Sequence, residues 1–253
     1  MIEEDMNGIR ERMVSELKPL IASFKTIHFD SFEFRVYRKM FNEYRDKTEL
    51  SDQILSYFIF IEQTPPLEQI DSTMKTEEQI PFFRKKTINL IFTSLGIIEM
   101  HGHKLADFAL LFLIANGYQF HVENPYSFPH VKHATSLTDL EKAPLRAKIN
   151  FAKDNGITFL ESAIDVELRN AIAHMKFEIK QIDLLQNQPV FDVYVNGKPA
   201  MDRIIKCMKK MSVCVETMDK IWNELSDIMK SRVEEAKKQK NITDTPKISH
   251  RKI

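Results

Sequence analysis

A short segment in the second half of the sequence carries three polar side chains that could together bind an anion and transfer a proton. It reads Asp-Val-Glu-Leu-Arg-Asn-Ala-Ile-Ala-His and contains Arg169, Asn170 and His174. The surrounding Leu, Ala and Ile residues favour a helix, on which Asn170 and His174 share a face because they are four positions apart. Arg169 lies about 100° behind Asn170, but its long stem can bring the guanidinium into the same groove. A cation with five donors, an amide and a titratable imidazole would then meet.

The position of this segment in its predicted helix also matters. A strand pattern begins by Phe177, so His174 lies near the C-terminal end of the helix, where the helix dipole favours the imidazolium form. The small residues Ala171 and Ala173 would let another helix approach closely. A purely structural interpretation stays open: the His at the helix end would cap carbonyls, and Arg169 would pair with Asp165 or Glu167.

The motif Arg169-Asn170-Ala-Ile-Ala-His174 resembles the signature of the HEPN superfamily, which is Arg, four to six residues, then His, with a polar residue after the Arg in catalytic members. The resemblance covers roughly residues 80 to 235. It implies a homodimer with two motifs across a shared cleft, and RNA bound there without a metal or other cofactor.

For a catalytic member, the resemblance implies a role for each motif residue. His174 would be the general acid or base for attack of the ribose 2′-hydroxyl, Arg169 would bind the phosphate, and Asn170 would orient it. The products would be a 2′,3′-cyclic phosphate and a 5′-hydroxyl, and the setting a defence or toxin system with an antitoxin or regulatory partner. The alternative is a non-catalytic HEPN-like module for dimerisation or interaction.

Other groups are weaker candidates for chemistry. His101 and His103 point about 200° apart on a helix and cannot grip one metal ion together. His130 and His133 have ligand spacing but no fixed third ligand, so no metal site is predicted. Two cysteines, Cys207 and Cys214, fit buried packing beside the seam of the last helix.

The amino-acid composition excludes several classes of protein. The 253 residues hold 36 basic and 36 acidic side chains and only 6 glycines. A zero net charge argues against coating nucleic acid by bulk charge, although a local basic cleft is compatible with it. Scarce glycine excludes glycine-rich phosphate loops and favours helices. Two cysteines are too few for a disulfide framework, and the N-terminal residues are acidic and lack the apolar run of a signal peptide. Both features predict a cytoplasmic protein.

Hydrophobic periodicity predicts an all-α bundle of long antiparallel helices. The first helix covers residues 2 to 24, kinked or ended by Pro19. Within residues 29–47, Phe32, Phe34 and Val36 alternate as in a strand, but the wider spacing also fits a helix, which is favoured. A further helix is predicted over 51–62, followed by a linker over 67–79. Residues 82–116 form the most apolar helix, ended by Asn116-Gly117. Its polar patch, Glu99 to Asp107, interrupts the apolar run, so no membrane span is predicted.

The second half predicts a long loop over 118–135, helices from 136 and over 158–174, and a β-hairpin over 177–196 ending at Asn196-Gly197. A heptad-like seam follows from Met201 to Met229, within a helix over about 200–237 that needs a partner helix, in this chain or a second copy. The predicted organisation is an N-terminal helical extension (1–75), an HEPN-like domain (80–237) and a disordered tail (238–253).

Overall fold

The computed structural model describes residues 2–26, 35–36, 38–46, 76–123, 131–185 and 188–243. The described chain is mainly helical, with a small antiparallel sheet before the last helix, as the sequence predicts. The described residues up to Val215 form one compact unit, and those from Glu216 onward form a second. The predicted helix over 51–62 lies outside the described residues, whereas residues 35–36 and 38–46 confirm helix within 29–47.

Helix α1 (Ile2–Thr26) continues through Pro19, so this proline does not end it. Its apolar stripe buries Ile9, Met13 and Leu17. On its other side, the Glu16 carboxylate accepts the backbone N–H groups of Thr158 and Phe159, at 2.8 and 3.0 Å. These are the first amides of α6 (Phe159–Ala163), so α1 caps a helix of the motif-bearing region and belongs to the same unit.

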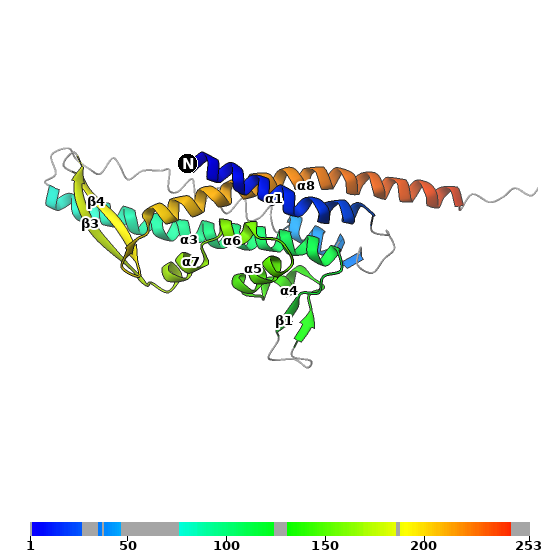
Figure 1. Cartoon of the computed structure of the whole chain (residues 1–253), viewed down its shortest axis with the longest axis horizontal. Helices are drawn as coiled ribbons and strands as arrows, with labels where there is room; N and C mark the ends of the chain where they lie inside the picture. The colour runs from blue at the N-terminus through cyan, green and yellow to red at the C-terminus, as the bar shows by residue number, and fades with distance from the viewer. Residues whose placement is uncertain are drawn as a thin grey trace, which may run out of the picture. The chain divides into compact units, whose positions relative to one another are not determined.

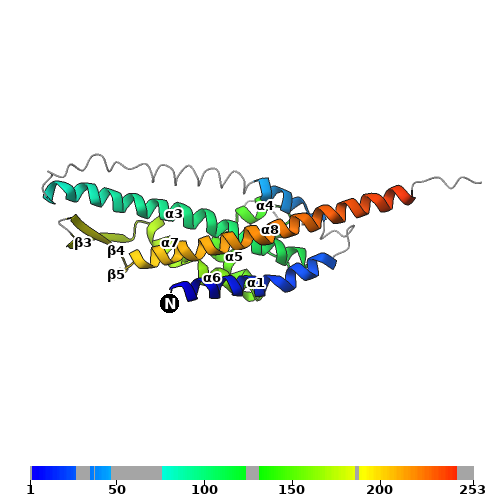
Figure 2. The same ribbon diagram turned by 90° about the horizontal axis from the view of Figure 1, so that it is seen from above.

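Helix α3 (Thr76–Ala115) begins within the predicted linker and runs beside α1 in the same direction (Figures 1 and 2), so these two long helices are parallel rather than antiparallel as predicted. Residues 105–113 are all buried, as the continuous apolar run predicts. The helix ends as expected: Gly117 has φ +86°, and the N–H of Tyr118 bonds the carbonyl of Leu113 at 3.0 Å. Within the described residues, no helix has both the length and the apolar character to cross a membrane.

The predicted loop over 118–135 contains a two-stranded antiparallel pair instead. Strand β1 (His121–Glu123) pairs with β2 (Val131–His133), with His121 opposite His133. The prediction was wrong here because each strand has three residues, too few to display alternation. Val122 is buried and so contributes to the core.

Four short helices follow: α4 (Leu137–Glu141), α5 (Leu145–Asp154), α6 and α7 (Val166–Ala173). The single helix predicted over 158–174 is therefore two helices, because the chain turns extended at Ile164 and Asp165 begins a new helix. Helix α5 crosses α3 closely at Gly102, where a Cβ atom would lie 3.1 Å from Leu145.

The predicted hairpin is confirmed as β3 (Phe177–Leu185) and β4 (Gln188–Val195), and a third strand, β5 (Lys198–Pro199), extends the sheet. Asn196 and Gly197, both at positive φ, form the two-residue turn between β4 and β5. The sheet lies beside the N-terminal part of α3 (Figure 1). One core cluster joins α3, α7, β4 and the last helix; its buried members include Ile91, Leu168, Ile172, Val193 and Ile204.

Helix α8 (Met201–Thr243) extends six residues past the predicted end at 237, since Lys238, Gln239 and Lys240 favour helix and Pro246 is the first breaker. The predicted tail is thus helical to Thr243, and residues 244–253 lie outside the described part. In the first unit, Cys207 and Cys214 are buried, as predicted. In the second unit, α8 continues from Glu216 with Met218, Ile221 and Leu225 on one face.

Candidate functional site

Helix α7 is fixed at its start by a side-chain cap and along its length by two buried anchors. Asp165 is the N-cap residue, and its Oδ1 accepts the N–H of Leu168 at 2.9 Å. Leu168 and Ile172 are fully buried in the core cluster. Burial of each such side chain stabilises the fold by about 1.5–3 kcal/mol. The polar residues between these anchors are therefore held at defined positions.

Arg169 lies half-buried and points to α3. Its Nε and Nη2 donate to the two carboxylate oxygens of Glu99, and its Nη1 donates to Asn170 Oδ1 at 2.8 Å. The guanidinium does come round to Asn170, as expected. The suggestion that Asp165 or Glu167 pairs with Arg169 was wrong, because both carboxylates face Arg203 from α8.

The Glu99 carboxylate connects Arg169 to a line of polar side chains along α3 and α5. His103 Nε2 lies 3.4 Å from Glu99 Oε1, and His103 Nδ1 lies 3.0 Å from Lys148 Nζ. Lys148, fully buried, donates to Asp107 Oδ1 at 2.6 Å. We call these six residues the polar network: Asp107, Lys148, His103, Glu99, Arg169 and Asn170.

The contacts of His103 fix its tautomer. An ammonium group can only donate hydrogen bonds, so His103 Nδ1 must accept the bond from Lys148, and the ring proton is on Nε2, which faces Glu99. The hydrogen bond from His103 lowers the pKa of Glu99 from 4.5 to about 2; burial opposes this shift, and Arg169 adds to it. Glu99 is therefore ionised whenever the protein is near neutral pH.

His174 stands at the other end of α7 and is exposed. It is the C-cap residue: its backbone N–H bonds the carbonyl of Asn170, while its imidazole makes no hydrogen bond or ion pair with the described residues. The next two amides, of Met175 and Lys176, bond the carbonyls of Ile172 and Ala171, which is a Schellman motif. Met175 takes the left-handed position usually given to glycine, with φ +53°.

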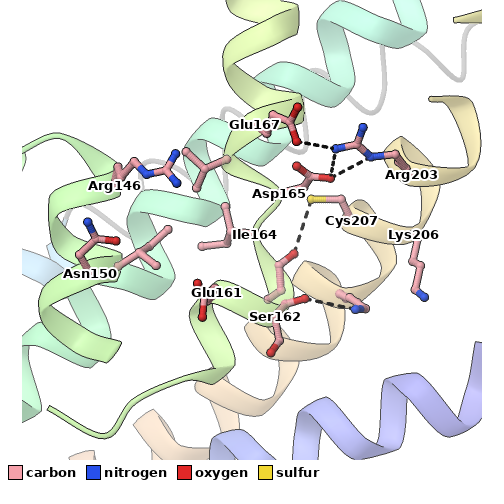
Figure 3. Close-up of a pocket in the computed structure, with 14 residues that line it drawn as sticks. Arg146, Asn150, Glu161, Ser162, Ile164, Asp165, Glu167, Arg203, Lys206 and Cys207 are labelled. Carbon is pink, nitrogen blue, oxygen red and sulfur yellow. Dashed lines mark hydrogen bonds and ion pairs between the residues drawn. The ribbon is translucent and has the colours of Figure 1, made fainter. Parts of the chain in front are cut away.

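A pocket of about 310 Å³ opens at the N-terminal end of α7, between α5, α6 and α8 (Figure 3). Arg146 extends into it from α5, and Arg203 reaches Asp165 from α8. Cys207 lies in its wall, and burial raises the pKa of this thiol. Neither Arg146 nor Arg203 was singled out from the sequence.

The motif was found from the sequence, but most of its supporting residues were not. Arg169 and Asn170 are brought together by a hydrogen bond, whereas Arg169 and His174 share no contact. Glu99, His103 and Asp107 were visible as a polar stripe at four-residue spacing in an apolar helix, which is the signal that could have identified them. Lys148 offered no such signal.

The described residues contain no cluster of three His, Cys, Asp or Glu side chains suited to a metal ion. The imidazole of His133 contacts that of His121 in a tilted arrangement, with ring centroids 4.5 Å apart, and His130 lies outside the described residues. The suggested His130–His133 pair therefore gains no third ligand from the part of the chain that is described. No protein-family model matches this sequence, and neither does any curated protein or solved structure.

Proposed function

We propose that this protein is a metal-independent endoribonuclease of the HEPN type, with Arg169, Asn170 and His174 as its reactive groups. The observation that carries the proposal is the contrast between the environments of Arg169 and His174. Arg169 is held in place from two sides, whereas the His174 imidazole is exposed and has no partner among the described residues. A bound phosphate needs an oriented donor, and proton transfer needs an accessible base.

Arg169 retains donors for a phosphate. Of the five N–H groups of a guanidinium, two donate to Glu99 and one to Asn170, so two remain. The side chain is 26% exposed, enough for these donors to be reached. Glu99 orients the guanidinium, and the remaining donors would stabilise charge that develops on the phosphate oxygens.

His174 would accept the proton of a ribose 2′-hydroxyl while the 2′-oxygen attacks the adjacent phosphorus. The bond from phosphorus to the 5′-oxygen then breaks, and this oxygen takes a proton from an imidazolium or from water. The products are a 2′,3′-cyclic phosphate and a 5′-hydroxyl. A homodimer, which the resemblance implies, would supply a second His174 as the acid.

The backbone beside His174 supports a specialised role for this end of α7. Met175 adopts a left-handed conformation, which costs a non-glycine residue about 1–2 kcal/mol. Strained backbone of this kind clusters at functional sites.

The test is cleavage of a fluorescent single-stranded RNA in EDTA. Wild type should cleave it, His174→Ala should be slower by about 10²–10⁴-fold, and an RNA with 2′-deoxyribose at the cut position should resist. His133→Ala, which removes another exposed histidine, is the matched control and should leave the rate unchanged. Cleavage that persists in His174→Ala, or that stops in EDTA, would contradict the proposal.

A second candidate is a non-catalytic helical interaction module. It is favoured by the Arg169–Glu99 ion pair, which satisfies the guanidinium as a structural contact would. In that case wild type would cleave no RNA, and Arg169→Ala would lower only the melting temperature.

A further inference from the structure

The pocket at the N-terminal end of α7 has more positive than negative charge available to a ligand. Four basic side chains line it, against three carboxylates. Asp165 and Glu167 are both occupied by Arg203, whose Nη2 lies 2.8 and 3.6 Å from their oxygens. Glu161 pairs at 2.8 Å with Lys153, which is outside the lining. Every carboxylate of the pocket therefore has a cation partner.

Of the basic side chains that do not pair with these carboxylates, Arg146 is the one that faces the pocket. It extends from α5 toward the middle of the pocket (Figure 3), and it makes no ion pair or hydrogen bond with the described residues. Lys206 extends away from the middle in the same view, and Lys210 donates to the carbonyl of Ser162 at 3.2 Å. A planar guanidinium that faces a pocket binds phosphate oxygens in a two-point arrangement.

The remaining wall is suited to a ligand larger than a bare ion. Ile149, Ile164 and Val166 contribute apolar surface beside Arg146, and Asn150 adds an exposed amide. A volume of about 310 Å³ lies at the lower end of the range for small-molecule sites. The pocket therefore suits a phosphate group that is attached to an organic body.

The lining of the pocket on α7 ends at Glu167, and the motif residues follow along the same helix. Val166 lines the pocket, Asn170 follows four positions later, and His174 four positions after that, so the three lie along one side of the helix. Eight helical residues span about 12 Å, so a ligand a few units long could reach from the pocket to His174.

We infer that this pocket is a phosphate-binding subsite anchored by Arg146. We further infer that the phosphate belongs to the RNA that the motif would cleave, a few nucleotides from the cut. The second inference rests on the proposed function, whereas the first does not. The other source of the same chemistry is a free phosphate ester, and the two sources are distinguished by experiment.

The experiment uses the full chain carrying His174→Ala, so that RNA is bound without being cut. Inorganic phosphate and a single-stranded RNA are titrated separately by calorimetry in a phosphate-free buffer, and the RNA is then titrated into protein saturated with phosphate to measure displacement. Arg146→Glu in this background should weaken phosphate binding at least about tenfold. Lys142→Glu reverses an exposed charge outside the pocket and should change nothing. Arg146 is exposed, so its replacement should leave the melting temperature unchanged.

Each of four results supports or overturns one of these inferences or the proposed function. RNA that displaces phosphate, and that binds Arg146→Glu more weakly, supports both inferences. Phosphate that binds through Arg146 but is not displaced by RNA overturns the assignment to RNA and leaves a site for free phosphate esters. Absence of phosphate binding, or equal loss in Lys142→Glu, overturns the subsite. Wild type that cleaves no RNA would overturn the proposed function but not a measured phosphate site.

Discussion

Two parts of the molecule around α7 differ in the burial of their basic side chains. We call the buried part at Lys148 and Asp107 the inner end, and the exposed C-terminal end of α7 at His174 the outer end. At the inner end, Lys148 is fully buried and its ammonium contacts Asp107 and His103. At the outer end, His174 is exposed and its imidazole contacts none of the described residues. Arg169 lies between them, half-buried and paired with Glu99. Burial therefore separates the groups that hold this region together from those that are available to a ligand.

Breaking the inner end should have the largest effect on stability. Lys148→Met leaves the buried Asp107 carboxylate without its ammonium partner, and it should lower the free energy of unfolding by about 3–5 kcal/mol. Urea denaturation followed by circular dichroism measures this loss. The double variant Lys148→Met with Asp107→Leu is the control and should recover most of it, because a well-packed apolar pair replaces the ion pair. A loss below about 0.5 kcal/mol in the single variant would show that the inner end is not structural.

The middle of the polar network should give an intermediate effect. Arg169→Ala removes the partner of a carboxylate that is 36% exposed, so water compensates in part, and the expected loss is about 1–2 kcal/mol. A double-mutant cycle with Glu99→Gln measures the coupling between the two side chains, expected near 1 kcal/mol. Additive losses would mean that the ion pair contributes nothing to stability.

The outer end carries backbone strain that can be relieved. Met175→Gly places glycine at the left-handed position of the Schellman motif and should raise the free energy of unfolding by about 1 kcal/mol. Ala173→Gly is the matched control: it introduces glycine two residues earlier, inside α7, and should destabilise by about 0.5–1 kcal/mol. Equal effects of the two changes would mean that Met175 is not strained.

The same contrast explains what the sequence could predict. The motif and the end of the hairpin were predicted because their signals are local: Asn170 and His174 are four positions apart, and Asn196-Gly197 marks the turn that ends β4. A local signal also existed for the break before α7: Asp165 is a typical N-cap residue, and its side chain accepts the N–H of Leu168. The apolar pattern on both sides of Asp165 nevertheless favoured one continuous helix. The role of Lys148 was not readable, since a lysine in an amphipathic helix is normally exposed and only the packing of α5 on α3 buries this one. For the same reason, the Glu99 partner of Arg169, 70 residues away, could not be identified.

Acid tests the Glu99 carboxylate itself, through the dependence of stability on pH. The pKa of Glu99 is about 2 in the folded protein against 4.5 unfolded, so the unfolded chain binds more protons between these values and stability rises with pH there. The contribution of Glu99 is complete above about pH 5 and is lost as the pH falls toward 2. The stability difference between wild type and Glu99→Gln should therefore shrink over this window in urea titrations at stepped pH.

Asp139 provides the comparison for that experiment. Burial would raise its pKa, but the hydrogen bonds from Lys132, the Thr135 N–H and Ser136 outweigh burial and lower the pKa from 3.8 to about 2. Asp139→Asn should show a similar loss of acid dependence without any effect on Arg169, because Asp139 has no contact with the polar network. If both variants reduce the pH dependence of stability while only Glu99→Gln changes RNA cleavage, Glu99 acts on cleavage by orienting Arg169 and not by stabilising the fold. A constant difference between wild type and Glu99→Gln from pH 5 to 2 would instead mean that His103 and Arg169 do not hold this carboxylate in its ionised form.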